Sequence, residues 1–306
     1  MFSCLRGKRL VFLAVLCLSM LGLACLLAAD TSSVGGGIAT PGAAPLNPQF
    51  EEYLNRGGAV AGPHFTDEGH ALGLIPSPIP PRKHIPPKPG KLRQGSGLPT
   101  SYDMRSLNFL TPAKDQGTCG CCWAFATYGS LESQDKQFFG LNLNFSENNL
   151  IHLSGFEWAP CYGGNIQMSS AYLARYAGPI NETADPYNPD PNGSYCATCT
   201  PSRYIDNVDW LPVRANATDN DYIKQAVMDH GGIYTTLQWE DGSYDPTTYT
   251  YYHQEKQGVL GTNHAVVIVG WDDAKVVPAA STLGAGAFIA RNSWGPGWGD
   301  PSEGGG

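Results

Sequence analysis

Gln116-Gly-Thr-Cys-Gly-Cys-Cys-Trp-Ala-Phe125 is the most informative stretch of this 306-residue chain. It places the thiol of Cys122 at the start of an apolar helix, with the side-chain amide of Gln116 six residues upstream. A thiol attacks a carbonyl well only as the thiolate, and a helix N-terminus, with its partial positive charge and free N–H groups, lowers the pKa of a thiol. The stretch therefore predicts a cysteine nucleophile at Cys122.

Helix signals follow this stretch. Apolar residues recur from Cys122 to Phe139 without a proline, and Gly140 should end that helix. Ser146 has a polar partner three residues on, so we expect it to cap a second helix. A third helix is expected from Ile166 to Tyr176, ended by Gly178-Pro179. This part of the chain is therefore predicted to be helical.

After about residue 205 the pattern changes to short apolar runs between turn residues, which predict β-strands. These runs are Ile233–Leu237, His264–Val269 and Ala287–Ala290. One helix is expected among them, from Asp219 to Met228, opened by Asn216. The 37 glycines and 24 prolines of the chain favour a loop-rich fold. A helical part followed by a β-rich part predicts an α+β domain.

A cysteine nucleophile needs a base within hydrogen-bond reach, and the base needs a third group to hold its ring. Of the seven histidines, His264 has the most suitable context, because a turn at Gly261-Thr-Asn263 precedes it and a buried strand follows. The stretch Arg291-Asn-Ser-Trp-Gly-Pro-Gly-Trp298 comes after another predicted strand and offers Asn292 as the third group. Its amide oxygen can accept from one ring N–H, which leaves the other ring nitrogen to face Cys122.

These motifs resemble those of the papain-like cysteine proteases, and together they are very specific. The first stretch differs from the family's Gln-Gly-x-Cys-Gly-Ser-Cys-Trp-Ala-Phe at one position, where Cys121 replaces serine. Asn263-His-Ala-Val266 and Asn292-Ser-Trp-Gly295 resemble the family's base and asparagine motifs. The resemblance covers about residues 98 to 300. It implies an α+β papain-like fold with a helical left half, an antiparallel β-barrel-like right half and the active-site cleft between them.

The resemblance also implies a role for each residue of the site. Cys122 is the nucleophile, and His264 is its base. Asn292 orients His264, and the side-chain amide of Gln116 joins the backbone N–H of Cys122 as an oxyanion donor. Trp294 shields the hydrogen bond between His264 and Asn292 from water. The implied activity is that of a cysteine-type endopeptidase, which cleaves peptide bonds through a thioester and needs no cofactor and no metal.

Cys161-Tyr-Gly-Gly164 resembles the family's Cys-x-Gly-Gly, and the resemblance implies a disulfide between Cys119 and Cys161. It also makes Gly163 and Gly164 candidate peptide-binding positions, because glycine lets a substrate backbone approach closely. Two apolar residues are candidate walls of the main specificity pocket, Ile166 and Ala265. Such a pocket would favour apolar side chains.

The cysteine pattern departs from the family in two places. The family's second disulfide needs a cysteine near residues 152–155, where this chain has none, so Cys196 and Cys199 are expected to pair with each other or to bridge a local loop. The residues around Cys196 and Cys199 include no further zinc ligands at the usual spacing. Cys121 is expected to be a small buried substitute for serine. The alternative is a redox latch, in which Cys121 pairs with Cys122 and switches the enzyme off.

The N-terminal residues 1–29 predict a secretory signal peptide. Three basic residues, Arg6, Lys8 and Arg9, precede an apolar run from Leu10 to Leu27. The length of this run also allows an uncleaved membrane anchor, and Cys25 allows lipid attachment. In either case we expect the protein to be exported, as a secreted, cell-surface or periplasmic protein.

Residues 30–97 predict a Pro-rich pro-segment or linker, because seven prolines between Ile75 and Pro89 favour an extended backbone. Two interpretations remain open. The segment is either a flexible spacer or an inhibitory pro-segment that lies along the active-site cleft until it is cut. The peptidase domain is expected to cover residues 98–306. The family continues with further strand residues where this chain has Pro301-Ser-Glu-Gly-Gly-Gly306, so we expect a C-terminally incomplete domain of a secreted, bacterial-type member.

The net charge of −8 and the lack of a basic block beyond the signal give no indication of nucleic-acid binding. The expected partners are protein or peptide substrates, and the chain is expected to be a monomer. Two other functions share parts of the pattern. One is a catalytically inactive papain-fold binding protein. The other is a different Cys–His acyltransferase, such as a transglutaminase, which lacks the Cys-x-Gly-Gly and Asn-Ser-Trp-Gly contexts.

Overall fold

The computed structural model describes residues 46–57, 62–79, 97–253, 261–277, 284–303 and 305–306. Residues 45–306 form one compact unit, which is described here by itself. The predicted signal peptide and the possible anchor lie outside the described residues. Within the described ranges, no helix combines the length and the apolar character that crossing a membrane requires.

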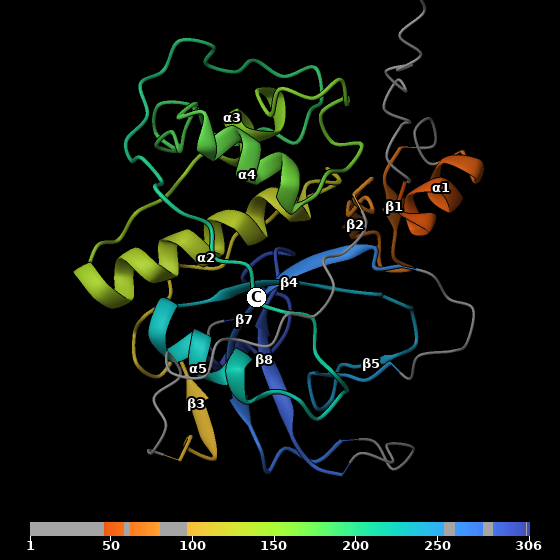
Figure 1. The fold of residues 1–306 in the computed structure, drawn as a ribbon, viewed down its shortest axis with the longest axis vertical. Helices are drawn as coiled ribbons and strands as arrows, with labels where there is room; N and C mark the ends of the chain where they lie inside the picture. Colours follow the sequence, from red (N-terminus) through yellow and green to blue (C-terminus); the bar gives the residue numbers. More distant parts are fainter. Residues whose placement is uncertain (1–45, 58–61, 80–96, 254–260, 278–283, 304) are drawn as a thin grey trace, which may run out of the picture. The chain divides into compact units, whose positions relative to one another are not determined.

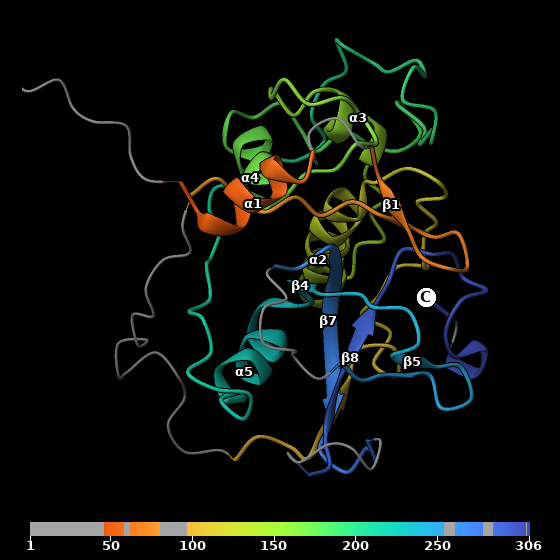
Figure 2. The ribbon, with the colours of Figure 1, turned by 90° about the vertical axis from the view of Figure 1, so that its right-hand side faces the viewer.

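Helix α2 (Cys122–Phe139) is the central element of the unit (Figure 1). It begins and ends at the predicted residues, and Gly140 closes it in the left-handed conformation with φ of 66°. On one side it packs against α3 (Glu147–His152) and α4 (Ile166–Ala174). On the other side it packs against the main β-sheet, as Figures 1 and 2 show. The helix is therefore buried on two sides.

The two smaller helices begin at polar caps. Ser146 accepts a hydrogen bond from the backbone N–H of Asn149 at 3.0 Å, which is the cap that the sequence predicts. Asn165 caps α4 in the same way through Met168. Helix α4 ends at Ala174 rather than at the expected Tyr176, because Tyr176 adopts a positive φ of 60°. A core of α2, α3 and α4 side chains fills the space between the helices, including Trp123, Phe125, Tyr128, Leu150 and Tyr172.

The main sheet is antiparallel and is built around β7 (His264–Asp272). This strand pairs with β4 (Ile233–Leu237), with β3 (Ser101–Asp103) and with β8 (Ala287–Arg291). The predicted strands are all present, and β7 is three residues longer than expected. Over the described residues the sheet is open rather than a closed barrel. Helix α5 (Asp221–His230) packs against β4 and β7.

Helix α5 begins two residues later than the sequence predicted. The side chain of Asn216 accepts from the backbone N–H of Thr218 at 2.9 Å, so it stabilises a turn ahead of the helix. Asn220 is the N-terminal cap instead. Two further strands, β5 (Tyr244–Asp245) and β6 (Thr250–Tyr251), form a small hairpin, and a 3-10 helix covers Pro301–Glu303.

The segment before the domain contains regular structure that the sequence did not predict. Helix α1 (Pro48–Asn55) begins at Asn47, whose side chain accepts from the backbone N–H of Gln49. Strands β1 (His64–Phe65) and β2 (Ala71–Leu72) form a short antiparallel pair. Each element is too short to give a clear apolar period. Most of the predicted polyproline stretch, residues 80–89, lies outside the described residues.

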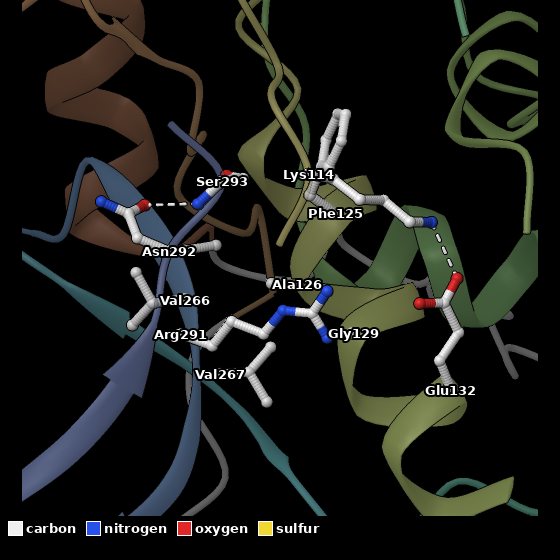
Figure 3. A pocket seen from close by; sticks show the side chains of 11 residues that line it. Lys114, Phe125, Ala126, Gly129, Glu132, Val266, Val267, Arg291, Asn292 and Ser293 are labelled. Carbon is white, nitrogen blue, oxygen red and sulfur yellow. Dashed lines mark hydrogen bonds and ion pairs between the residues drawn. The ribbon is translucent and has the colours of Figure 1, made fainter. Parts of the chain in front are cut away.

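A cluster of charged side chains lies between α2 and the sheet, around a small cavity (Figure 3). Lys114 Nζ donates to Glu132 Oε1 at 2.7 Å and to Glu147 Oε1 at 2.8 Å, and both carboxylates are buried. Thr111 donates to Glu132, and Arg291 donates to Thr111. Burial raises the pKa of Glu147 to about 7, although Lys114 acts in the opposite direction. One lysine is thus the cation that two buried carboxylates share.

Replacing Lys114 with methionine should leave these carboxylates without their shared cation. We expect the free energy of unfolding at pH 8, measured by urea denaturation, to fall by about 3–5 kcal/mol. The loss should be smaller at pH 5, because the raised pKa of Glu147 means that it is protonated there in the folded protein. Arg56→Met breaks an exposed ion pair with Glu52 and should cost less than about 1 kcal/mol. Equal losses in the two variants would contradict the role of Lys114.

Candidate active site

Cys122 is the first residue of α2, and its side chain is fully buried. The loop before it is held by the disulfide between Cys119 and Cys161, which the resemblance implied. The backbone N–H of Gly120 donates to the carbonyl of Cys161 at 3.0 Å, which adds a second link between the same segments. The start of α2 is therefore fixed against the loop that carries Gly163 and Gly164.

His264 and Asn292 lie together. The Nε2–H of His264 donates to Asn292 Oδ1 at 2.7 Å, and the same oxygen accepts from the backbone N–H of Ser293 at 2.8 Å. The Nδ1 atom of His264 is buried and has no hydrogen-bond partner. The Trp294 ring stacks on the imidazole, with centroids 4.7 Å apart. Asn292 thus holds one ring nitrogen, which leaves the other for the thiol, while Trp294 covers the pair.

Gln116 is fully buried, and each part of it has a partner. Its side-chain oxygen accepts a hydrogen bond from Ser293 Oγ at 2.7 Å. The amide nitrogen Nε2 therefore points away from Ser293. Nε2 donates to the carbonyls of Cys119 at 2.8 Å and Ala71 at 3.0 Å. The amide therefore already holds a peptide carbonyl oxygen, which is the task of an oxyanion donor.

Two loops join Gln116 to the His264–Asn292 pair. The backbone N–H of Gln116 donates to the carbonyl of Ser293 at 2.8 Å, and that of Gly295 donates to the carbonyl of Lys114 at 3.0 Å. Asp115 and Trp294 form an antiparallel bridge between these bonds. The Gln116 amide and the asparagine motif are consequently parts of one hydrogen-bonded unit.

Residues 71–75 of the N-terminal segment run directly over this site. The carbonyl of Gly73 accepts from the backbone N–H of Gly164 at 2.9 Å, and the N–H of Ile75 donates to the carbonyl of Gly164 at 2.9 Å. Leu74 forms a parallel bridge with Gly164 and donates to the carbonyl of Asn263 at 3.1 Å. Gly164 therefore makes the strand-like hydrogen bonds that the sequence suggested, and its partner is the chain's own segment.

Close backbone contacts require glycine on both sides of this pairing. A Cβ atom on Gly73 would lie 1.9 Å from the carbonyl oxygen of Gly120, and one on Gly164 would lie 2.3 Å from the Trp123 ring. Gly163 has a φ of 117° and contacts Ile75. Gly73 and Gly163 let the segment approach the neighbouring loops, whereas Gly164 lets its loop pack on the Trp123 ring.

Leu74 packs into the buried cluster that contains Cys122 and Ala265. This contact agrees with the expectation that Ala265 is a wall of an apolar pocket. Ile166 begins α4 and is half-buried, but it is not part of that cluster. Its neighbour Asn165 donates to the carbonyl of Ile75 at 3.3 Å, so Ile166 lies near the C-terminal end of residues 71–75.

Burial changes the ionisation of Cys122 and His264. It raises the pKa of Cys122 to about 11, although hydrogen bonds from the backbone of Ala265 and Gly73 act against it. It lowers the pKa of His264 to about 4, against the hydrogen bond to Asn292. The expected lowering of the thiol pKa by the helix N-terminus is therefore wrong for this closed form, because desolvation outweighs the helix. Both groups are neutral at pH 7.

Of the remaining cysteines, one is a buried free thiol and two are paired in a disulfide. Cys121 is buried, and its Sγ lies 3.1 Å from the hydroxyl of Tyr187, which itself donates to the carbonyl of Gln116 at 2.7 Å. Cys121 and Cys122 are both free thiols here. Cys196 and Cys199 form a disulfide with each other. Within the described ranges, no group of three His, Cys, Asp or Glu side chains could hold a metal ion.

The sequence interpretation missed three participants: Ser293, Tyr187 and the segment 71–75. Ser293 lies inside the asparagine motif, but only the fold brings it to Gln116. No sequence motif marks Tyr187 as part of the site. The run Ala71-Leu-Gly-Leu-Ile75 did carry a signal, because it is apolar with a central glycine inside an otherwise irregular segment.

The raised pKa of Cys122 can be measured directly. The difference in ultraviolet thiolate absorbance between the parent chain and Cys122→Ser should titrate with a midpoint near pH 11, because the thiol is desolvated. Cys121→Ser should leave this transition in place. A midpoint below about 8.5, the ordinary value for cysteine, would contradict the closed form described here.

Comparison with known proteins supplies independent findings. Residues 98–304 match the family described as papain family cysteine protease. Cathepsin K of Mus musculus is 31% identical over 204 residues, which cover 66% of this chain and 58% of that protein. The chain therefore spans less than two thirds of this relative's length.

Similar solved structures include two cysteine proteases. The cysteine protease and lectin-like domains of Cwp84, a surface layer associated protein of Clostridium difficile, give a TM-score of 0.64 at 22% identity, over 85% of this chain and 55% of that one. The proform of Amb a 11, a cysteine protease and ragweed pollen allergen, gives 0.53 at 27% identity, over 70% and 61%. The first likeness supports the fold alone. With most of the domain matched by the family, the chain belongs to the papain family of cysteine proteases.

Proposed function

We propose that this chain is a cysteine-type endopeptidase that hydrolyses peptide bonds through a thioester. The observation that carries the proposal is the hydrogen-bonded unit of Gln116, Ser293, Asn292 and His264, with the Gln116 amide holding a peptide carbonyl. This unit combines an oriented base with an oxyanion donor, as acyl transfer needs. Cys122, at the start of α2, supplies the thiol.

The proposed reaction has two stages. Cys122, deprotonated by His264, attacks the substrate carbonyl carbon, and the developing oxyanion takes the place at the Gln116 amide that Ala71 now occupies. His264 then protonates the leaving amine, which gives a thioester on Cys122. In the second stage His264 removes a proton from water, the hydroxide attacks the thioester, and the carboxylic acid leaves as the thiol is restored. Asn292 keeps the His264 ring in place throughout.

We further propose that residues 71–75 act as an inhibitory pro-segment. Leu74 packs against the cluster that contains Cys122, Ala71 occupies the Gln116 amide, and the backbone of the segment pairs with Gly164. Of the two interpretations that the sequence left open, these contacts favour the inhibitory one over the flexible spacer. The pairing does not depend on the polyproline stretch that follows.

The contacts also suggest why this segment resists cleavage. The carbonyl held by Gln116 belongs to the peptide between Ala71 and Leu72, whereas the backbone that hydrogen-bonds the Cys122 sulfur belongs to Gly73. Attack requires one peptide to present its carbonyl carbon to the thiol and its oxygen to the oxyanion donor at the same time. Here two successive peptides share these positions, so the arrangement is unreactive.

Export of the protein belongs to the same proposal. Two disulfides, Cys119–Cys161 and Cys196–Cys199, are expected in an oxidising compartment and are rare in the cytosol. They agree with a signal peptide at the N-terminus, and we propose a secreted or cell-surface location.

The identity of the nucleophile can be tested with a thiol-directed epoxide. After reduction and removal of the N-terminal segment, we expect one adduct, on Cys122, and complete loss of peptide hydrolysis in Cys122→Ser. The matched variant Cys121→Ser restores the family's residue and should keep both labelling and activity. A folded protein without an adduct would favour the inactive binding protein, and transfer of the acyl group to an amine in place of water would favour an acyltransferase.

If oxidation inactivates the parent but spares Cys121→Ser, the redox latch is supported.

Opening the active site should activate the full-length chain. Leu72→Asp with Leu74→Asp introduces one charge at a buried and one at a half-buried apolar position of the segment, so the segment should detach. We expect the rate of epoxide labelling at pH 7 to rise by at least about tenfold, because Cys122 becomes solvated and can pair with His264. Leu54→Asp, an exposed position of α1, is the control and should change little. Equal labelling rates for the double variant and its parent would refute an inhibitory segment.

A further inference from the structure

The disulfide between Cys196 and Cys199 belongs to a long connection with almost no regular structure. Residues 175–220, all of which the structure describes, contain no helix and no strand apart from a single bridge at Asn181. The two cysteines are only three positions apart in the sequence, whereas Cys119 and Cys161 are 42 apart. A crosslink over so few residues removes less entropy from the unfolded chain, so its main effect is on the local fold.

The two disulfides of the described residues differ in their access to solvent. Cys119 is fully buried, and Cys161 is 5% exposed. Cys196 and Cys199 are half-buried instead, and the residues next to them are exposed, namely Tyr195, Ala197, Thr198 and Thr200. Thiol–disulfide exchange begins when a thiolate reaches a sulfur, so its rate depends on this access. A dissolved dithiol should therefore react with Cys196–Cys199 before it reacts with Cys119–Cys161.

The Cys196–Cys199 disulfide lies where the two ends of a loop, residues 184–199, meet. The backbone N–H of Cys196 donates to Asp185 Oδ2 at 2.9 Å, and Cys199 Sγ lies 3.7 Å from the carbonyl oxygen of Ala184. Asn149 of α3 joins both ends, because its Nδ2 donates to Asp185 Oδ2 at 2.7 Å and to the carbonyl of Cys196 at 2.8 Å. Asp185 is buried, so its carboxylate depends on these donors.

Away from this base, a hollow separates the two limbs of the loop. Residues 184–188 line it from the first limb, and residues 194–196 line it from the second. Because a hollow rather than packed side chains lies between the limbs there, the hydrogen bonds and the crosslink at the base contribute most of what joins them.

The first limb also contacts the loop that carries Gln116. The hydroxyl of Tyr187 donates to the carbonyl of Gln116 at 2.7 Å and lies 3.1 Å from Cys121 Sγ. The Tyr187 ring meets Phe125 of α2 edge-to-face, with centroids 4.9 Å apart. Tyr187 follows Asp185 by two residues, so a shift at the base of the loop displaces the group that holds the backbone of Gln116.

We propose that Cys196–Cys199 is a redox-modifiable site, and that its reduction by a small dissolved dithiol loosens the loop and lowers activity through Tyr187 and Gln116. A thiolate of the dithiol attacks one sulfur, forms a mixed disulfide and releases the other cysteine as a thiolate. The second thiol then attacks the mixed disulfide, and the reagent leaves as a cyclic disulfide. The dithiol thus supplies the electrons and the protons that convert the disulfide to two thiols. The effect on activity rests on the proposed peptidase function, whereas the reduction itself does not.

The first measurement locates the site in the full-length parent chain. The folded protein is incubated with rising concentrations of dithiothreitol, the free thiols are blocked, and mass spectrometry counts the blocked cysteines at each position. We expect Cys196 and Cys199 to be half reduced at a concentration at least about tenfold below that for Cys119 and Cys161. Reduction of both disulfides together, or of Cys119–Cys161 first, would overturn the modifiable site.

The second measurement follows the same chain by hydrogen–deuterium exchange after selective reduction. Exchange should become at least about tenfold faster in residues 184–200 and about threefold faster in residues 114–121, because the loop no longer holds Gln116 firmly. Helix α5, which packs on β4 and β7, is the internal control and should keep its rate. Faster exchange in residues 184–200 alone would overturn the coupling to Gln116.

The third measurement uses the chain opened by Leu72→Asp and Leu74→Asp. Selective reduction should lower kcat for a peptide substrate about fivefold with little change in KM, because an oxyanion donor acts mainly on the transition state. Reoxidation should restore kcat. Cys196→Ser with Cys199→Ser should have the lower kcat from the outset and should not respond to dithiothreitol, which separates this effect from reduction of Cys122. Tyr187→Phe should remove most of the response.

The outcomes separate this inference from the proposed function. A kcat that selective reduction leaves unchanged would overturn the regulation, and this result needs no cysteine variant that might fail to fold. Absence of hydrolysis in both redox forms would overturn the peptidase function, while the exchange rates would still decide whether the disulfide is coupled to Gln116. Selective reduction, faster exchange in both segments and a reversible fall in kcat together would support the inference.

Discussion

The active site depends on the hydrogen bonds between the loop at residues 114–116 and the loop at residues 293–295. They connect the oxyanion amide of Gln116, which comes from the loop before α2, to the asparagine that follows β8. The thiol on α2 and the base on β7 are also joined by the backbone contact of Ala265 with Cys122, but that contact does not position Gln116. With the link between the two loops, the carbonyl-binding amide and the His264–Asn292 pair have fixed positions relative to each other, as preorganised catalysis requires.

The same preorganisation explains how a short peptide can close the site. Gly73 has no side chain, so it can approach Gly120 and pair with Gly164, while the leucines on either side of it pack into two apolar clusters. Burial then favours the neutral forms of Cys122 and His264. Under the proposed function, the segment inhibits in two ways, because it occupies the Gln116 amide and it opposes formation of the thiolate.

The sequence predicted much of the fold, because its signals are local. A proline-free apolar helix and its glycine stop are readable within 20 residues, and so are the Ser146 cap and the apolar run of β7. The family resemblance supplied the disulfide between Cys119 and Cys161. The contact of Ser293 with Gln116, 177 residues apart, could not be read in this way, since no periodicity reports it. The pKa of Cys122 was misjudged because burial by residues 71–75 depends on tertiary structure.

Acylation of Cys122 during hydrolysis is the central step of the proposed function. The most direct measurement is to quench the opened chain with acid while it turns over a slow ester substrate and to locate the acyl group by peptide mass spectrometry. We predict one thioester, on the peptide that contains Cys122, which disappears as product forms. Hydrolysis with no acylated peptide, or with the acyl group on another residue such as Cys121, would contradict the account.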